Sequence, residues 1–229
     1  MSSSEMLTRD DTAIAAKKMD RMYRHQRRFY DLTRKFYLLG RDGMIRGLKP
    51  APDTHILEIG CGTARNLILA AKYFPDADFF GIDISDEMLI TARANIAREK
   101  LDDAIEVAQA DATSFDPKAL FGVERFERIF ISYSLSMIPV WRAVLAHAMP
   151  MLAPNGELHI VDFGDQRGLP GFFARALQRW LTLFHVTPRG DLEVQLRALA
   201  DYRGAELHFA RPFRGYAQYA VLRMNHGSA

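Results

Sequence analysis

Short apolar runs alternate with longer amphipathic stretches along most of this chain. The runs that can cross a sheet once lie at 55–59, 78–82, 104–108, 127–133 and 156–163. Apolar residues recur at helical spacing between and after them, at 64–74, 86–99, 116–121, 140–152, 171–184 and 191–202. Alternation of this kind predicts βαβ units and a parallel sheet that is covered on both faces.

The two ends of the chain follow different patterns. Near the carboxyl end, "AELHFARPF" and "GYAQYAVLRM" are joined at Arg214-Gly215 with no helical segment between them, which predicts an antiparallel hairpin at the edge of the sheet. Near the amino end, 10–30 and 34–48 have helical patterns, and prolines follow at positions 50 and 52. We therefore expect a helical arm over 1–49 and one α/β domain over 50–229, with seven strands in a mostly parallel sheet.

Composition adds a charge asymmetry and little else. The 229 residues are 48% hydrophobic and carry a net charge of +2, an ordinary globular balance. Residues 1–49 hold twelve Lys and Arg against six Asp and Glu, so the arm carries +6 and the remainder −4. A basic arm predicts an anionic partner, although charge alone fits a solvated helix face equally well. A single cysteine, no signal-peptide pattern and no long apolar run predict a cytoplasmic protein.

The segment "HILEIGCGTARN" places two glycines directly after the first predicted strand. Gly60 and Gly62 let the backbone turn sharply and approach a ligand at the start of a helix. A dinucleotide fingerprint requires a third glycine where Arg65 stands, so that reading fits poorly. Glu58, inside the strand, favours a cationic ligand over a pyrophosphate. We interpret Cys61 as a small loop residue, since no activating base is adjacent.

Two further acids follow the next strands. Asp83 in "FFGIDIS" lies about twenty residues beyond the glycines, where a carboxylate can accept both hydroxyls of a ribose. Asp111 in "AQADATSF" follows the third strand and could accept the exocyclic amine of an adenine. Asp111 could instead cap a turn, and Glu58 could pair with a basic residue of the arm. A nucleoside with a cationic, phosphate-free tail suits all three acids, and S-adenosylmethionine is such a molecule.

With "LAPNGELHIVDF", these segments give four motifs in order over residues 54 to 163. Together they resemble the class I S-adenosylmethionine-dependent methyltransferases, which implies a Rossmann-like fold. The resemblance implies that the methionine part is held by Glu58, Gly60 and Gly62, the ribose by Asp83, and the adenine near Asp111 and Ala112, with Ile84 and Met88 as apolar walls. Ala64 stands where the family commonly has a third glycine.

The methyl acceptor is indicated by residues 23–45, "YRHQRRFYDLTRKFYLLGRDGMI". This segment resembles that of bacterial betaine-lipid N-methyltransferases, most specifically in "YDLTRKFYLLGRD". It is similar, more faintly, to phosphoethanolamine methyltransferases. The resemblance implies three methylations of the amine of a diacylglyceryl-homoserine lipid. The candidate side chains are Tyr30 and Tyr133 to orient the nitrogen, Asp31 to accept a proton, and Arg34, Arg41 and Arg189 to bind the acceptor's carboxylate.

Residues 170–184, "PGFFARALQRWLTLF", form an amphipathic pattern that fits two environments. Trp, Phe and Leu opposite Arg suit a helix lying in a membrane interface, and they also suit a helix packed on the sheet. Together with the basic arm, this pattern predicts peripheral attachment to anionic lipid at the inner face of the membrane. A lipid headgroup is the expected partner.

Two other functions compete with the lipid N-methyltransferase. A nucleic-acid methyltransferase would suit the basic arm, but the Asp/Asn-Pro-Pro-aromatic signature after the fourth strand is replaced by "SYSLSM", so no nucleic acid is expected. A cofactor-binding regulator without catalytic activity is the third hypothesis. No group of His, Cys or acids has the spacing of metal ligands, so no metal is predicted.

Overall fold

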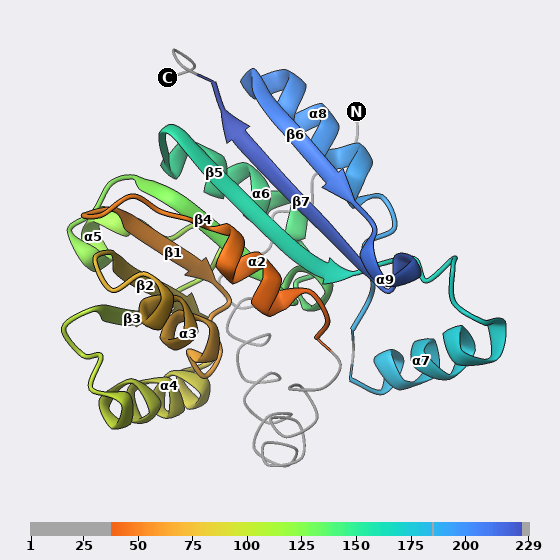
Figure 1. The fold of residues 1–229 in the computed structure, drawn as a ribbon, viewed down its shortest axis with the longest axis horizontal. Coiled ribbons are helices and arrows are strands. Elements are labelled where there is room, and N and C mark those ends of the chain that lie inside the picture. Colours follow the sequence, from red (N-terminus) through yellow and green to blue (C-terminus); the bar gives the residue numbers. More distant parts are fainter. Residues whose placement is uncertain (1–37, 185, 226–229) are drawn as a thin grey trace.

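The computed structural model describes residues 38–184 and 186–225. Within these ranges a single seven-stranded sheet has the order β3-β2-β1-β4-β5-β7-β6 (Figure 1). Strands β1 to β5 are parallel to one another, and β7 is antiparallel to both β5 and β6. This confirms the predicted Rossmann-like, mostly parallel sheet with a terminal hairpin. The strands are β1 (His55–Ile59), β2 (Asp78–Asp83), β3 (Ile105–Gln109), β4 (Phe126–Ser132), β5 (Leu152–Phe163), β6 (Ala205–Ala210) and β7 (Ala217–Met224).

Helices cover both faces of this sheet (Figure 1). Side chains of α2, α3, α4 and α7 pack in one apolar core, and those of α5, α6 and α8 in the other. The alternation of side chains along a strand explains the division, because Ile56 faces the first core and Leu57 the second. The helices are α2 (Arg41–Gly47), α3 (Arg65–Tyr73), α4 (Asp86–Glu99), α5 (Pro117–Phe121), α6 (Trp141–Ala148), α7 (Gly171–Leu183) and α8 (Leu192–Arg203).

Local sequence signals set several helix ends. Ser85 caps α4 by accepting a hydrogen bond from the backbone of Met88 at 3.3 Å, and the first turn of that helix is acidic. Asp116 caps α5, whose first residue is Pro117 and whose carboxyl end is closed by Gly122 in the left-handed conformation. These signals explain why the predicted bounds of the two helices agree closely with the observed ones.

Two predicted helices are shorter than expected. The helix expected over 34–48 begins at Arg41, after a turn in which Gly40 has a φ of 84°. The helix expected over 140–152 ends as α6 at Ala148, and a 3₁₀ turn, η2 (Met149–Met151), leads directly into β5 at Leu152. The second difference arises because β5 begins earlier than its predicted start, where Leu152 pairs with β4 before a register shift.

The connection between β6 and β7 is a tight turn. Its four residues, α9 (Pro212–Gly215), have a helical hydrogen bond, but Phe213 and Arg214 have φ values of 56° and 58°. Because these values lie in the left-handed region, the segment reverses the chain and does not extend as a helix. The predicted hairpin is thus confirmed, with β6 at the edge of the sheet and β7 inside it.

The last residues of the predicted arm belong to the body of the protein. Leu38, Met44, Ile45 and Leu48 are buried in the same core as α3 and α4. Arg128 of β4 also donates from Nε to the carbonyl of Leu48 at 2.8 Å. The division at residue 49 stays a prediction, since most of the arm lies outside the described residues. No helix in the described part of the chain is both long and apolar enough to cross a bilayer.

A buried ionic cluster joins β4, β5 and β7 at the end of the sheet remote from the glycine loop. Glu157 lies 2.8 Å from His159 Nε2 and 2.7 Å from Arg223 Nε, and Arg128 approaches it at 3.4 Å. The hydrogen bond with His159 is the largest influence on Glu157. With Arg223 and Arg128 it outweighs burial and lowers the pKa of Glu157 to about 2. This carboxylate is therefore ionised throughout the ordinary pH range.

Candidate active site

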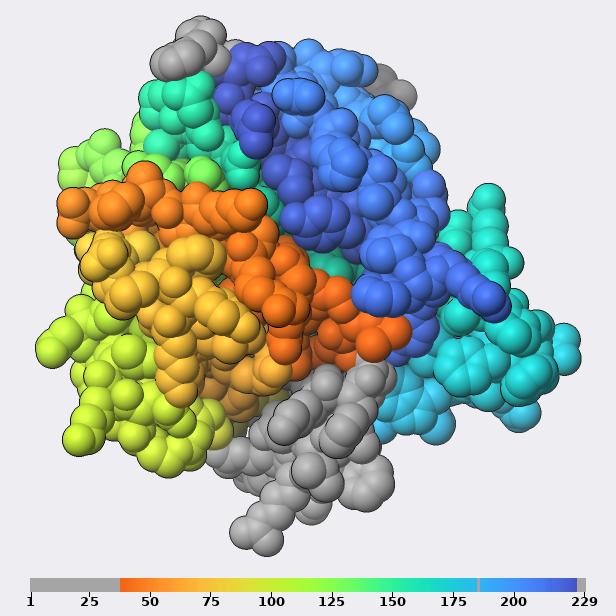
Figure 2. Space-filling view, viewed as in Figure 1, coloured from red at the N-terminus to blue at the C-terminus, as the bar shows by residue number. Residues whose placement is uncertain are grey.

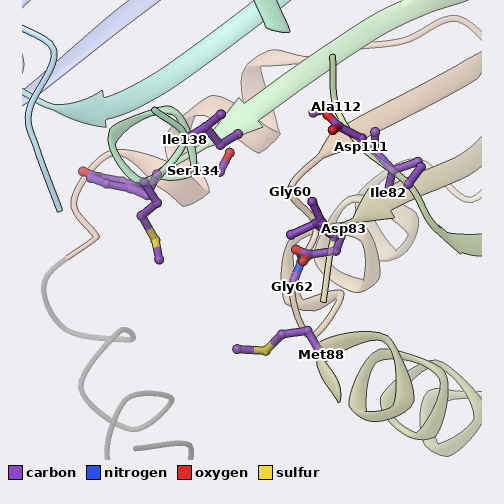
Figure 3. A pocket seen from close by; sticks show the side chains of 13 residues that line it. Gly60, Gly62, Ile82, Asp83, Met88, Asp111, Ala112, Ser134 and Ile138 are labelled. Atoms are coloured by element: carbon purple, nitrogen blue, oxygen red, sulfur yellow. Dashed lines mark hydrogen bonds between the residues drawn. The ribbon is translucent and has the colours of Figure 1, made fainter. Parts of the chain in front are cut away.

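A hollow opens where the carboxyl ends of β1 to β4 meet (Figure 3). Open α/β sheets bind ligands at this edge because the loops there are free of the sheet's own packing. The hollow and its open mouth together contain about 670 Å³ of empty space. It is lined by Gly60, Gly62, Ile82, Asp83, Ile84, Met88, Ala110, Asp111, Ala112, Tyr133, Ser134, Met137 and Ile138.

The glycine loop is fixed to the neighbouring strands. The φ values of Gly60 and Gly62 are 76° and 54°, a region that glycine enters without strain. A Cβ atom on Gly60 would lie 2.7 Å from the Cβ of Ser134, which is closer than real contacts. The backbone nitrogens of Gly60 and Cys61 donate to the carbonyl of Ile82 at 2.8 and 2.9 Å. The predicted need for glycine thus has a steric cause at position 60.

Asp83 organises the loop that it faces. Its Oδ2 accepts a hydrogen bond from the backbone nitrogen of Gly62 at 2.8 Å, and its Oδ1 accepts one from that of Ser85 at 2.9 Å. Figure 3 shows the side chain beside Gly62 on the wall of the hollow. An ionised carboxylate has about four acceptor positions, so two N–H bonds do not exhaust it. Asp83 is thereby held in one orientation at the position expected for a ribose ligand.

Asp111 caps a turn and also lies on the wall of the hollow. Its Oδ1 accepts from the backbone nitrogen and the hydroxyl of Thr113 at 2.8 and 2.7 Å, so it caps the turn after β3. Together with Ala112 it also lines the hollow, opposite the apolar side chain of Ile138 in Figure 3. The turn and the candidate adenine contact are therefore properties of the same side chain.

Glu58 lies behind the glycine loop and not on the wall of the hollow. It is fully buried, and its Oε1 accepts a hydrogen bond from Nδ2 of Asn66 at 2.6 Å. Asn66 belongs to the first turn of α3, so this bond ties β1 to the helix that follows the loop. Glu58 thus supports the loop from beneath, and its contact with a methionine moiety stays a prediction.

Cys61 is buried between the two glycines. Burial raises the pKa of its thiol well above the usual value, and the carboxylates of Asp83 and Glu58 raise it further. The thiol therefore stays protonated at neutral pH and is not an activated nucleophile. This agrees with the interpretation of Cys61 as a small residue in a tight loop.

Tyr133 lines the hollow and also fastens the end of the arm to the body. Its hydroxyl donates to the carbonyl of Leu39 at 2.6 Å, and its ring packs edge-to-face on Phe163 with centroids 4.7 Å apart. Burial raises the pKa of Tyr133 far above the ordinary value, and the nearby Asp162 and Tyr216 add to this effect. The phenol keeps its proton and cannot act as a general base. Its oxygen can still accept a hydrogen bond.

Arg189 has a different set of partners from the one expected for it. Its guanidinium donates to the carbonyls of Leu135, Ser136 and Ile138 at 3.0, 3.4 and 2.7 Å. Burial lowers its pKa, an effect that the charge of Asp162 opposes. Arg189 does not line the hollow, and its Nε and one Nη donate to these carbonyls. In the structure it braces the wall of the hollow from behind, and its contact with an acceptor carboxylate stays a prediction.

Of the four remaining predicted residues, the structure describes only Arg41. Arg41 is buried at the start of α2, with its Nε 3.7 Å from Asp42, and does not line the hollow. Tyr30, Asp31 and Arg34 lie outside the described residues. No group of three potential metal ligands gathers anywhere in the part of the chain that the structure describes.

The sequence analysis missed one wall of the hollow, the segment that follows β4. Ser134, Met137 and Ile138 line it, and the 3₁₀ helix η1 (Leu135–Met137) holds them there. Asp162, fully buried at the end of β5, fixes this segment by accepting from the backbone nitrogen of Ser136 at 3.0 Å. The sequence feature that could have indicated this wall is the segment "SYSLSM", which stands where a nucleic-acid methyltransferase would have its signature.

Comparison with known proteins gives this geometry a family context. Residues 56–156, from β1 into β5, match the family described as "Methyltransferase domain". The match covers the glycine loop and the turns that carry Asp83, Asp111 and Tyr133. It therefore includes all four loops around the hollow.

Similar proteins carry out several methylations. The tRNA1(Val) (adenine(37)-N6)-methyltransferase of Porphyromonas gingivalis is 29% identical over 202 residues, which is 76% of this chain and 78% of that protein. The solved structure of the plantazolicin methyltransferase BpumL has a TM-score of 0.70 at 16% identity and covers 96% of this chain and 100% of its own. Phosphoethanolamine N-methyltransferase 2 of Haemonchus contortus has a TM-score of 0.63 at 16% identity, and the match covers 81% of this chain and 52% of that one. The structural similarities show the fold. The domain match indicates a methyltransferase domain over residues 56–156.

Proposed function

We propose that this chain is an S-adenosylmethionine-dependent N-methyltransferase that methylates the amine of a diacylglyceryl-homoserine lipid three times, giving the trimethylated betaine lipid. The observation that carries the methyltransferase part is the hollow itself. A glycine loop and two oriented carboxylates, Asp83 and Asp111, face one space at the carboxyl edge of the sheet. This space contains acids and apolar side chains, which suits a cationic nucleoside.

The residues present fit the cofactor by their chemistry. We assign Asp83 to the ribose hydroxyls, Asp111 and Ala112 to the adenine, and the backbone of Gly60 and Gly62 to the methionine part. Ile84 and Met88 provide apolar surface for the base. Glu58 contributes by holding the loop. When bound, the cofactor supplies a methyl group on a positively charged sulfur, and the protein's part is to position and desolvate the acceptor.

The wall after β4 supports an amine acceptor. The hydroxyl of Ser134 donates to the carbonyl of Ile59 at 3.1 Å, and that of Tyr133 donates to the carbonyl of Leu39. Because the proton of each hydroxyl is used in these bonds, each oxygen can offer only acceptor positions to the hollow. An N–H group matches such oxygens, and Met137 adds an apolar wall that favours the uncharged amine. We retain Tyr30, Asp31, Arg34 and Arg41 as candidates for the acceptor side of the site.

The lipid acceptor is tested with the purified full chain, S-adenosylmethionine and diacylglyceryl-homoserine in mixed micelles. Mass spectrometry should show monomethyl, dimethyl and trimethyl products in succession, and Asp83→Ala should abolish all three. An unchanged lipid, in the presence of protein that binds the cofactor, would refute the lipid assignment and leave the methyltransferase assignment intact. Phosphoethanolamine in the same assay tests the related small-amine acceptor.

RNA is the second candidate acceptor, because the Porphyromonas gingivalis relative is named for methylation of a tRNA adenine. Against it, "SYSLSM" occupies the place after β4 where nucleic-acid amino-methyltransferases have their signature. Incubation with bulk tRNA and radiolabelled cofactor separates the two candidates. Labelled tRNA whose yield falls steeply with salt would favour this second function.

A further inference from the structure

The helix α7 stands out because three of its six large apolar side chains are exposed to solvent. Of the nine large apolar side chains that are exposed in the described residues, three belong to this one helix: Phe172 at 72%, Phe173 at 46% and Leu183 at 73%. Leu181 is the one buried residue of the helix. Figure 1 shows α7 projecting from the edge of the molecule, and its segment forms the outer rim of the face drawn in Figure 2.

The helix has a packed side and a separate exposed apolar side. Successive residues are about 100° apart around a helix axis. Leu177, Leu181 and Phe184 therefore share one side, and they pack against the core. Phe172 and Leu183 lie within about 20° of each other on the opposite side, which faces solvent, and the half-exposed Phe173 lies about 100° from Phe172, at the border of the packed side. The two environments that the sequence pattern allowed, packing on the sheet and exposure to an interface, thus occur together on different sides of α7.

Cationic side chains border the exposed apolar side. Arg175 and Arg179 lie about 60° and 20° from Phe172 on the helix surface, and both are exposed. The helix "GFFARALQRWLTL" contains no acidic residue. Exposed Phe and Leu beside Arg, without neighbouring acids on the helix, match a surface that has both acyl chains and anionic headgroups. A second protein surface would have to supply the same combination of apolar area and negative charge.

The segment after α7 is bonded directly to the wall of the hollow. The backbone nitrogen of Thr187 donates to the carbonyl of Ser136 at 2.9 Å, and Arg189 donates to three carbonyls of residues 135–138. Before the helix, the chain leaves β5 at Phe163, beside the same wall. A surface bound by α7 is therefore connected at both ends of the helix to the side of the site that we assign to the acceptor.

We propose that α7 is a membrane-docking helix that inserts Phe172, Phe173 and Leu183 between the headgroups of an anionic lipid surface, with Arg175 and Arg179 contacting the headgroups. This proposal rests on the proposed lipid substrate for its purpose, but not for its test. It explains how a protein can reach a substrate that stays in a bilayer. It also predicts that the docking surface and the catalytic hollow are separable by mutation.

Vesicle binding of the full chain tests the docking surface without catalysis. We expect the protein to co-sediment with phosphatidylglycerol vesicles and much less with phosphatidylcholine vesicles. Phe172→Ser combined with Phe173→Ser should weaken binding at least about tenfold. Arg175→Ala combined with Arg179→Ala should weaken it about 25-fold at low salt. Matched controls are Tyr202→Ser, an exposed aromatic residue on α8, and Arg98→Ala, an exposed arginine on α4.

Trp180 gives an independent readout. It lies between Phe172 and Phe173 around the helix and is partly buried against the first core, whereas the chain's other tryptophan, Trp141, is fully buried in the opposite core. Lipids brominated in the upper acyl chain should quench Trp180 fluorescence in the wild-type protein and not in the double Phe variant. Equal vesicle binding by the wild type and both double variants would overturn the proposal. So would a dimer, detected by light scattering, that the double Phe variant converts to a monomer.

Failure of docking and failure of the proposed function give different results. Vesicle binding that depends on α7, without any lipid methylation, would support the docking proposal and refute the proposed lipid substrate. If the wild type and both double variants methylate vesicle-borne lipid at equal rates, the docking proposal is refuted and the proposed lipid substrate is supported. If both proposals hold, the variants should lose activity on vesicles and retain it on lipid in mixed micelles.

Discussion

Replacing Asp83 tests the central assignment, because this side chain both holds the glycine loop and faces the hollow. In Asp83→Ala the backbone nitrogens of Gly62 and Ser85 lose their acceptor. A bound ribose loses the acceptor for two hydroxyls. Each hydrogen bond to a charged group contributes about 1.5–3 kcal/mol. The two ribose bonds together therefore amount to about 3–6 kcal/mol, which corresponds to a loss of affinity of at least about 100-fold.

Titration calorimetry with S-adenosylhomocysteine measures this loss. The matched control is Asp86→Ala, an exposed acid in the first turn of α4 that pairs with Arg93 at 3.9 Å, which should bind normally. A 2′-deoxy analogue of the ligand separates a direct contact from collapse of the loop. The wild type should prefer the ribose form, and the Asp83 variant should bind both forms equally. A variant that keeps wild-type affinity, or that still prefers the ribose form, would refute the ribose assignment.

Three further predictions concern stability. Gly60 and Gly122 have nearly equal φ values of 76° and 73°, but an added Cβ would meet a side chain, at 2.7 Å, only at Gly60. In urea unfolding, Gly122→Ala should therefore lower the free energy of unfolding by about 1–2 kcal/mol, and Gly60→Ala should lower it by at least about 1 kcal/mol more. Equal losses would contradict the steric argument. The pKa of Glu157 is about 2 in the folded chain and about 4.3 in the unfolded chain. The ionised carboxylate therefore stabilises the fold above the unfolded pKa, and this contribution is lost as the pH falls toward 2. Glu157→Gln should flatten the stability profile between about pH 5 and pH 2, and an unchanged slope would show that the cluster does not contribute. Tyr133→Phe leaves the carbonyl of Leu39 without its donor and should lower thermal stability by about 1–2 kcal/mol, whereas no change would mean that water replaces the bond.

The sheet and the acidic rim of the hollow could be predicted because they depend on local patterns. Alternating apolar runs specify strands, and Asp83 and Asp111 follow those strands directly, so the topology brings them together. Ala64 shows the limit of motif reading. It is the residue before α3 and has a φ of 61°, a left-handed conformation that explains why glycine is usual there.

The contacts of long side chains could not be predicted. Arg189 reaches carbonyl groups more than fifty residues earlier in the chain, and nothing in its own neighbourhood signals those partners. Glu58 was correctly recognised as an unusual acid in a strand, but the direction of a strand residue depends on which face of the sheet it occupies. That face holds Asn66, and so the acid supports the loop from behind.

The position of β7 has a consequence for synthesis of the chain. β7 is made after β6 but lies between β6 and β5, so β5 has an unpaired edge until the last strand has left the ribosome. An exposed strand edge pairs readily with other chains. The nascent polypeptide therefore passes through an aggregation-prone stage in which its nucleoside-binding half can already be folded, and chaperone capture should be most frequent just before β7 emerges.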